Sequence, residues 1–412
     1  MTETTPPTDQ PPPDQEQWLT PGVRGIGSAS LLADVGHEIP TALLPSLLTS
    51  TLGAPAAALG AIEGISDALA GAARFGGGVL ADDPARRRKV AVGGYATTAV
   101  LGAATAGATA VWQVGVLRAA AWTARGLRVP ARNALLADIV PAKAYGRAYG
   151  FERMMDNLGA IFGPLLALGL VAWVGVQWAI GLSVIPGLLA AAAIVYAIRH
   201  TPGPASREKV PLKIRIRPVL KGDLGRLLGA VAAFEVGNVA ATLLILRASD
   251  LLAPEHGTKT ATTIALGLYT AYNVAAALAS VPAGRLSDRL GARGPVLVLA
   301  AGVAAFAVAY GMFAVTGAVI TVLAVPFVLA GVGIGAVETA QHSAVAALAP
   351  KDLRGSAFGM LATVQSLGNL AASTVAGVLW TVVSPTAAFT YLAAWMVLAL
   401  AGLLVAARRP RH

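Results

Sequence analysis

Carboxylates and a histidine stand at helical spacing inside a long apolar stretch near the start of the chain. Asp34 and Glu38 are four residues apart, so on a helix they share one face, with His37 beside them. The next apolar stretch repeats this spacing with Glu63 and Asp67. Ionisable groups in apolar surroundings are costly, so each of them is a candidate functional group. A partly desolvated carboxyl group can load and release a proton near neutral pH, which is the chemistry that this pattern indicates.

Arginines form a stripe on one face of the fourth apolar stretch. They are Arg118, Arg125, Arg128 and Arg132. The fifth stretch carries Glu152, Arg153 and Asp156. Such a stripe is not stable against hydrocarbon, so we expect it to meet the acids of the first, second and fifth stretches or a water-filled cavity. Structural ion pairs fit best for the arginines toward the end of the stripe, whereas Arg118 and Arg125 are equally good candidates for a functional role.

Asp34 is the best candidate for proton coupling, with Glu38 beside it on the same face. The segment Asp34-Val35-Gly36-His37 has a counterpart in Glu235-Val236-Gly237-Asn238, about 200 residues later. Glu235 is therefore the second choice for proton coupling, and a carboxylate hydrogen-bonded to a neighbouring helix is the alternative reading. We expect a central polar cavity lined by His37, Asp67, Arg118, Arg125, Asp156, Asn238, Glu338, Gln341 and His342.

Two histidines and two acids raise the possibility of a metal site. His342 follows Glu338 by four residues, and with Asp34 and His37 these side chains offer oxygen and nitrogen ligands to a divalent metal. The pattern has no fixed ligand spacing, so a polar cavity wall or a proton relay is the preferred reading. We assign no metal site and no cofactor, and the absence of cysteine excludes disulfides and thiolate metal sites.

The composition predicts an all-α integral membrane protein. Mean hydropathy is +0.66, 56% of the 412 residues are hydrophobic and 13% are charged, which is more apolar surface than a soluble domain can bury. We expect about twelve transmembrane helices in two pseudo-symmetric six-helix bundles. The candidate spans are 26–50, 55–81, 90–109, 111–136, 147–171, 176–198, 224–249, 262–285, 294–315, 317–347, 355–381 and 385–407. The expected segments are a disordered N-terminus (1–21), a first bundle (22–198), a linker (199–223), a second bundle (224–407) and a basic tail (408–412).

The positions of the basic residues along the chain indicate which loops lie on the cytoplasmic side of the membrane. Most of the 31 Lys and Arg residues lie in alternate inter-helix loops, in the linker and at the C-terminus, which predicts that both termini are cytoplasmic. The net charge of +10 therefore gives no support to nucleic-acid binding. The first 20 residues lack the basic start and apolar run of a signal peptide. Abundant Ala and Arg suggest a bacterial cytoplasmic membrane.

A short pattern occurs twice, each time between two apolar stretches. It reads Gly78-Val79-Leu80-Ala81-Asp82-Asp83-Pro84-Ala85-Arg86-Arg87 and then Gly284-Arg285-Leu286-Ser287-Asp288-Arg289-Leu290-Gly291-Ala292-Arg293. Both copies resemble the loop between the second and third, and the eighth and ninth, helices of the major facilitator superfamily. The resemblance implies a cytoplasmic gate built from Gly78, Asp82, Arg86, Gly284, Asp288, Arg289 and Arg293. The first copy departs from the family pattern at Asp83 and Ala85.

The fifth stretch resembles a motif of the drug–proton antiporters in that superfamily. Gly150, Gly159, Gly163 and Pro164 stand at its separations, while Ala167 replaces its last glycine. The glycines are expected to let this helix pack against the opposite half and Pro164 to bend it, and close packing alone would also account for them. The basic segment 125–132 is similar to the fourth-helix motif of the same group.

These features together predict a secondary transporter that works by alternating access, and not an enzyme. Proton-coupled efflux of a small organic molecule is the leading function, with the lipid bilayer, the substrate and protons as partners and a monomer as the expected state. The alternatives are a divalent-metal exporter using Asp34, His37, Glu338 and His342, faintly similar to ferroportins, and a proton-coupled uptake permease for a small organic solute. The sequence does not encode the substrate.

Overall fold

The computed structural model describes residues 18–201 and 214–408, and almost all of them are helical. The first half contains α1 (Pro21–Ser46), α2 (Ala56–Leu80), α3 (Pro84–Ala104), α4 (Val111–Ile139), α5 (Tyr145–Leu182) and α6 (Val184–Arg199). The second half contains α7 (Ile216–Val219), α8 (Gly222–Glu235), α9 (Ala241–His256), α10 (Thr258–Arg289), α11 (Gly294–Val315), α12 (Ile320–Leu348), α13 (Arg354–Val382) and α14 (Pro385–Arg408). Residues 1–17 of the expected disordered N-terminus, 202–213 of the linker and 409–412 of the basic tail lie outside the described residues.

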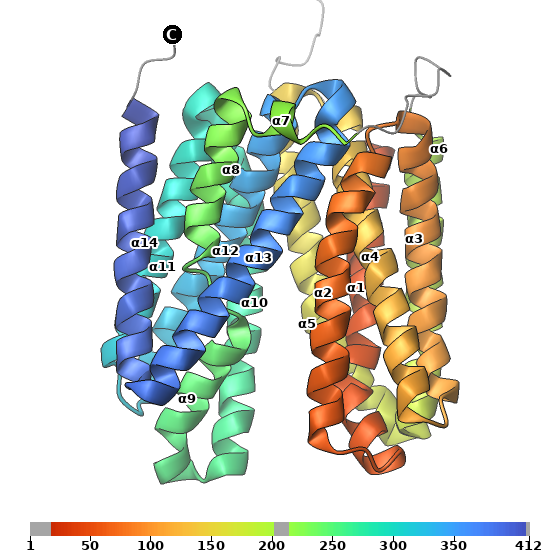
Figure 1. Ribbon diagram of the computed structural model, residues 1–412, viewed down its shortest axis with the longest axis vertical. Coiled ribbons are helices and arrows are strands. Elements are labelled where there is room, and N and C mark those ends of the chain that lie inside the picture. The colour runs from red at the N-terminus through yellow and green to blue at the C-terminus, as the bar shows by residue number, and fades with distance from the viewer. Residues whose placement is uncertain (1–17, 202–213, 409–412) are drawn as a thin grey trace, which may run out of the picture.

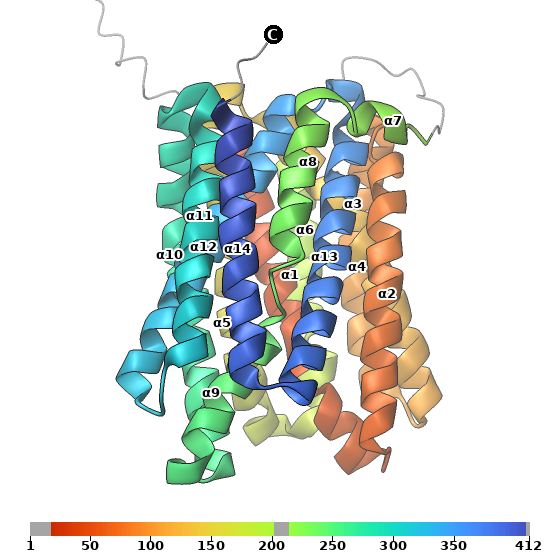
Figure 2. The ribbon, with the colours of Figure 1, turned by 60° about the vertical axis from the view of Figure 1, so that its left-hand side comes forward.

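The two halves stand side by side with their helices roughly parallel (Figure 1). Two crossed pairs join them: α5 packs against α10, and α2 packs against α13. In both views the ribbons of the halves meet at the end that holds α7 and the loop from Ala81 to Asp83 (Figure 2). We call this the basic end. The ribbons diverge toward the opposite end, where α9 and the start of α2 lie (Figure 1).

The seventh span differs most from expectation, because it is not one continuous helix over 224–249. α8 ends at Glu235, and a non-helical segment of five residues precedes α9, which continues to His256. The backbone N–H groups released by the break are satisfied by side chains: Val239 N donates to Tyr310 Oη at 3.3 Å, and Ala240 N donates to Ser373 Oγ at 2.9 Å. A break of this kind in the middle of a membrane span is tolerated only inside protein.

Smaller differences in helix ends have local causes. α3 begins at Pro84 instead of residue 90, because Asp83 caps it by accepting a hydrogen bond from Ala85 N at 2.9 Å, and Pro84 occupies the first helical position. The fifth span ends where expected, between residues 171 and 176, because the backbone leaves the helical region at Gly175, where φ is +80°. The following helical segment differs in that it is interrupted again after Leu182, before α6 begins at Val184.

Among the described residues, six segments are long and apolar enough by length and composition to cross a membrane. They are Pro84–Gly107, Ala142–Arg199, Thr258–Arg289, Gly291–Val315, Ile320–Leu348 and Pro385–Val405. α1, α2 and α4, which carry many of the ionisable side chains, are not among them, because these side chains lower the mean hydropathy of their helices.

Candidate functional site

The arginine stripe of α4 is satisfied from three different helices. Arg118 Nη2 lies 2.9 Å from Glu63 Oε1 on α2, and Arg125 Nη2 lies 3.3 Å from Asp34 Oδ1 on α1. Arg132 Nη1 lies 2.7 Å from Glu152 Oε1 on α5. The stripe therefore meets the acids of these three helices, and ion pairs hold α4 to α1, α2 and α5.

Arg128 is the exception in the stripe. Among the described residues it has no carboxylate within 4 Å, and its guanidinium lies 4.0 Å from the centre of the Tyr95 ring on α3. It is nevertheless buried, with 4% of the residue exposed. The ring face offers a cation–π contact but no negative charge.

His37 has a defined proton position in this arrangement. Arg125 Nη1 lies 2.8 Å from His37 Nε2, and because a guanidinium can only donate, Nε2 must accept. The ring proton is then on Nδ1, 3.7 Å from Asp34 Oδ1. Asp34, His37 and Arg125 thus form one contact set within the first half, with Glu38 Oε1 3.7 Å from the imidazole.

Trp122 is a site residue that sequence reasoning missed. Its ring lies 3.6 Å under the Arg118 guanidinium and 4.8 Å from the His37 ring, and its Nε1 donates to Asp67 Oδ1 at 2.7 Å. The signal for it was present, because Arg118, Trp122 and Arg125 have the spacing of one helix face.

A second charged network lies nearer the basic end. Glu152 accepts from Arg153 Nε at 2.7 Å and from Ser30 Oγ at 2.5 Å, in addition to its contact with Arg132. Asp156 Oδ2 lies 3.2 Å from Arg153 Nη1, and the same arginine reaches Glu338 Oε2 of the second half at 3.7 Å. The network thus links the halves through Arg153.

Replacement of Glu152 by glutamine is expected to cost about 3–5 kcal/mol of stability, because it removes the nearest carboxylate of two buried guanidinium groups, those of Arg132 and Arg153, and leaves them only longer contacts to Asp156 and Glu338. Asp352→Asn is the control, since Asp352 forms an exposed pair with Arg215 at 2.8 Å that is worth less than about 1 kcal/mol. Thermal unfolding of both variants in detergent measures the difference. Equal shifts in Tm would contradict a structural role for Glu152.

The second half holds a carboxylate without a positive partner. Glu235 is the last residue of α8 and is 4% exposed. It accepts hydrogen bonds from Asn238 Nδ2 at 3.0 Å and from Gln341 Nε2 at 3.2 Å. Gln341 Oε1 in turn accepts from Gln365 Nε2 at 2.7 Å. Among the described residues, no Lys or Arg lies within 4 Å of Glu235.

The proposed metal ligands are not brought together. His342 packs beside Tyr149 and Phe358, with ring centroids at 5.8 and 6.1 Å, and its Nδ1 lies 2.7 Å from the carbonyl oxygen of Glu338. Over the described residues no group of three or more His, Asp or Glu side chains is placed to hold a metal ion. The structure therefore does not bring Asp34, His37, Glu338 and His342 together as a metal site.

The two loop copies contact the opposite half in a crossed, symmetric manner. Asp288 accepts from the backbone N of Gly146 at 2.7 Å and of Arg147 at 3.0 Å, at the start of α5. Asp82 accepts from Ser356 N at 2.8 Å and from Ser356 Oγ at 2.5 Å, at the start of α13. Burial raises the pKa of the Asp82 carboxyl, and the two Ser356 donors oppose this rise. Each carboxylate lies at a helix N-terminus, where the helix dipole favours negative charge.

Glycines bring the backbones of the halves into direct contact beside these carboxylates. A Cβ atom on Gly284 would lie 2.1 Å from Gly146 O, and one on Gly78 would lie 2.6 Å from Gly355 O. No side chain fits at either crossing. The basic end is therefore closed by backbone packing.

The basic residues expected at the gate lie differently. Arg86 pairs locally with Asp83 at 3.5 Å, and Arg289 and Arg293 are exposed. The buried arginines are instead Arg87 and Arg354. They are joined across the halves because Arg87 contacts Asp138 on α4, and Arg354 Nη1 lies 3.0 Å from the same carboxylate. The sequence carried no spacing signal for this contact between distant segments.

The glycines of α5 pack against two different partners. Gly150 faces the opposite half, since a Cβ there would lie 2.4 Å from Ser280 O on α10. Gly159 and Gly163 instead pack against α1, where added Cβ atoms would lie 2.7 Å from Asp34 Cβ and 2.4 Å from Glu38 Cβ. The expectation that all three contact the opposite half is wrong for these two, because α5 leaves α10 after its first turns and then packs against α1.

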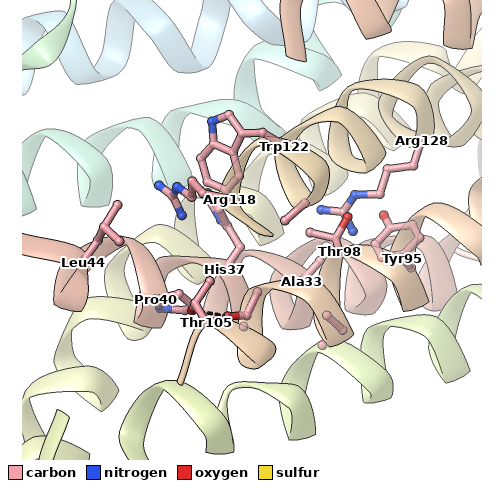
Figure 3. Close-up of a pocket in the computed structure, with 15 residues that line it drawn as sticks. Ala33, His37, Pro40, Leu44, Tyr95, Thr98, Thr105, Arg118, Trp122 and Arg128 are labelled. Atoms are coloured by element: carbon pink, nitrogen blue, oxygen red, sulfur yellow. Dashed lines mark hydrogen bonds between the residues drawn. The ribbon is translucent and has the colours of Figure 1, made fainter. Parts of the chain in front are cut away.

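One cavity lies inside the first half, between α1, α3, α4 and α6 (Figure 3). His37 and Arg118, expected in a central cavity between the halves, line this one instead, together with Tyr95, Thr98 and Arg128. Asp156 and Glu338 lie at the inter-half contact of Arg153. Asn238 and Gln341 surround Glu235.

Comparison with known proteins places this geometry in a family. The family model described as Major Facilitator Superfamily matches residues 26–249 and 227–412. An uncharacterized MFS-type transporter of Methanocaldococcus jannaschii is 27% identical over 383 residues, which cover 92% of this chain and 93% of the relative. A multi-drug resistance efflux pump PmrA homolog of Lactococcus lactis is 31% identical over 68 residues, covering 16% of this chain and 57% of the relative.

Solved structures share the fold at low identity. The human organic anion transporter MFSD10 superposes with a TM-score of 0.71 and 16% identity, over 95% of this chain and all of that one. A bacterial homologue of the iron transporter ferroportin, in an outward-facing state, gives a TM-score of 0.71 with 14% identity, over 94% of this chain and all of that one. The chain thus shares its overall fold with these two structures.

Proposed function

We propose, because this chain belongs to the Major Facilitator Superfamily of secondary transporters, that it exports a small organic molecule in exchange for protons. The substrate would cross between the two halves, which rock about it. The basic end would be the cytoplasmic end, as the positive-inside distribution indicates, with both termini in the cytoplasm of a bacterial cell and the monomer as the working unit.

The observation that carries this proposal is the environment of Glu235. A buried carboxylate that receives only amide hydrogen bonds has no compensation for a full negative charge, so it favours taking up a proton. Asp34, by contrast, lies 3.3 Å from Arg125, and both belong to the first half. Rocking of the halves does not separate that pair. We therefore place Glu235 ahead of Asp34 as the proton carrier.

Protonation of Glu235 would be coupled to the break between α8 and α9. The ionised carboxylate accepts from both Asn238 and Gln341, whereas the protonated group carries one O–H donor and has less capacity to accept. One of the two amides must then turn or separate. Asn238 lies in the break. Protonation of Glu235 would therefore weaken a hydrogen bond that holds the non-helical segment in place, and the segment could then move.

The Asp34–Arg125 pair would serve the substrate. Arg125 is 26% exposed at its side chain, which is more than Arg118 or Arg132, and Glu38 beside it is 25% exposed. A substrate that binds Arg125 or Glu38 would change the strength of the Asp34–Arg125 ion pair. In this scheme Asp34 and Glu38 act as a second protonation site, and its proton uptake depends on whether substrate is bound.

Export as the direction has two supports. The efflux pump of Lactococcus lactis is similar to a short part of the chain. The glycines of α5 that resemble the antiporter motif pack directly on Asp34 and Glu38, so this motif would fix the spacing of the charged face. Uptake of an organic solute is the alternative outcome of a transport assay.

A ligand screen on the purified protein tests the substrate class. A ligand at a hundredfold excess over its Kd raises stability by about 2.7 kcal/mol, so thermal shifts with organic cations, antibiotics, organic anions and divalent metals are directly comparable. We expect an organic compound to stabilise the wild type and also His342→Ala, and to drive proton movement in proteoliposomes. Stabilisation by a divalent metal that is lost in His37→Ala would overturn organic efflux. Proton-independent flux of the stabilising compound would overturn proton coupling.

A further inference from the structure

The cavity inside the first half is unusual in its charge. Its lining includes Arg118, Arg128 and His37, and it includes no Asp or Glu. It lies between α1, α3, α4 and α6, away from the contact between the halves (Figure 3). The transport scheme above therefore does not use it.

Unsatisfied donors surround this cavity. Arg128 Nε, Arg118 Nε and His37 Nδ1 are buried and have no hydrogen-bond partner, and each belongs to a lining residue. The tautomer derived above places a proton on His37 Nδ1, so all three atoms are N–H donors. No unsatisfied acceptor side chain lines the cavity. A buried set of donors without acceptors is complementary to an anion.

Arg128 lacks the counter-charge that its neighbours have. Each of the other three arginines on α4 has a carboxylate within 4 Å, while Arg128 has only the Tyr95 ring. Figure 3 shows its guanidinium extending toward the side of the cavity where Thr98 and Tyr95 lie. Burial of an unpaired guanidinium in a membrane helix is costly, so a negative charge in this cavity would lower the cost of burying Arg128.

Cavity size restricts the anion. The space open to the centre of a water molecule is about 20 Å³, close to what a single water needs. So small a cavity favours a monoatomic anion over an organic carboxylate or phosphate. We propose that the first half binds one halide-class anion, physiologically chloride, beside Arg128. Bound there, the chloride would hold α4 against α3, and Asp34 would keep Arg125 as its ion-pair partner.

Thermal stability in defined salts tests this site. The full-length protein is purified in sodium gluconate and titrated with sodium chloride or bromide at constant ionic strength. We expect a saturable rise in Tm with either halide, because the ion binds only the folded state, and none with further gluconate. Arg128→Gln should weaken halide binding by more than about tenfold, as loss of a charge-assisted hydrogen bond predicts.

Matched variants separate the site from general salt effects. Arg247→Gln is the control: Arg247 is also a buried arginine, but it lies on α9 and donates to Phe313 O at 3.1 Å. It should keep the full halide response. Arg128→Lys should keep a weaker response, because it retains the charge. A wild-type protein without a saturable response, or an Arg128→Gln variant with an unchanged one, would overturn the proposal.

Bromide diffraction locates the ion independently of any variant. Crystals of the wild type grown in bromide should show an anomalous difference peak within hydrogen-bond distance of Arg128 nitrogen atoms. This measurement decides the matter even where Arg128→Gln does not fold. Absence of a peak in this cavity would mean that water alone occupies it, and the proposal would be wrong.

Discussion

Replacement of Gly284 by alanine is expected to open the basic end and to lower the transport rate by at least about fivefold. The new Cβ would lie 2.1 Å from Gly146 O, a backbone atom that cannot turn aside. α10 and α5 must then separate, which also breaks the hydrogen bonds from the start of α5 to Asp288. Overpacking of this kind costs about 1–3 kcal/mol, enough to shift a two-state equilibrium by about five- to 150-fold.

Distance measurements between spin labels detect this opening. The chain contains no cysteine, so Ala142→Cys and Leu290→Cys introduce one label on each half at the basic end. We expect the Gly284→Ala variant to add a longer distance that the parent protein lacks. Gly267→Ala is the matched control on the same helix, because a Cβ there meets nothing within 4 Å. An unchanged distance distribution in Gly284→Ala would show that backbone contact does not hold the end closed.

Replacement of Glu235 by glutamine is expected to abolish proton-driven transport while exchange of substrate across the membrane continues. Glutamine has nearly the same shape and keeps an acceptor for one of the two amides, but it takes up no proton. Without a titrating group at position 235, a pH gradient no longer changes the conformation of the non-helical segment between α8 and α9. Proteoliposomes with an imposed pH gradient measure the driven rate, and counterflow of labelled substrate measures exchange.

Two comparisons make this second experiment specific. Glu255→Gln changes an exposed glutamate of α9 and should leave both rates unaltered. Asp34→Asn should alter substrate affinity more than proton coupling, because it disrupts the pair with Arg125. If Glu235→Gln keeps full proton-driven transport and Asp34→Asn loses it, the order of the two carriers proposed above is reversed.

Repetition in the sequence was a sufficient guide to the equivalent placement of Asp82 and Asp288. Asp82 and Asp288 occupy equivalent places in the two copies, and both accept hydrogen bonds at the start of a helix from the other half. This worked because a repeated loop between repeated helices must occupy symmetric positions. The contact of Asp138 with Arg87 and Arg354 has no counterpart in the repeat, and only the folded chain shows it.

Helical spacing was a good guide to which faces are polar and a poor one to which residues pair. It placed the arginines of α4 on one face toward acids, but it did not distinguish Arg128, which meets Tyr95, from Arg125, which meets Asp34. Residues three apart on one helix point to different neighbours when the adjacent helices cross at different heights. Spacing along one element carries no information about those crossings.

The sequence by itself determined the membrane environment, the division into two related halves and the family, because hydropathy, charge distribution and repetition are properties of the linear chain. Only the tertiary structure decided that the seventh span breaks after Glu235, that His342 packs beside two aromatic rings and that an arginine-lined cavity lies within the first half. Each of these depends on what a neighbouring helix supplies: donors for the freed backbone, rings for an imidazole, or no carboxylate for a guanidinium. Such pairings are set by helix packing over long sequence separations.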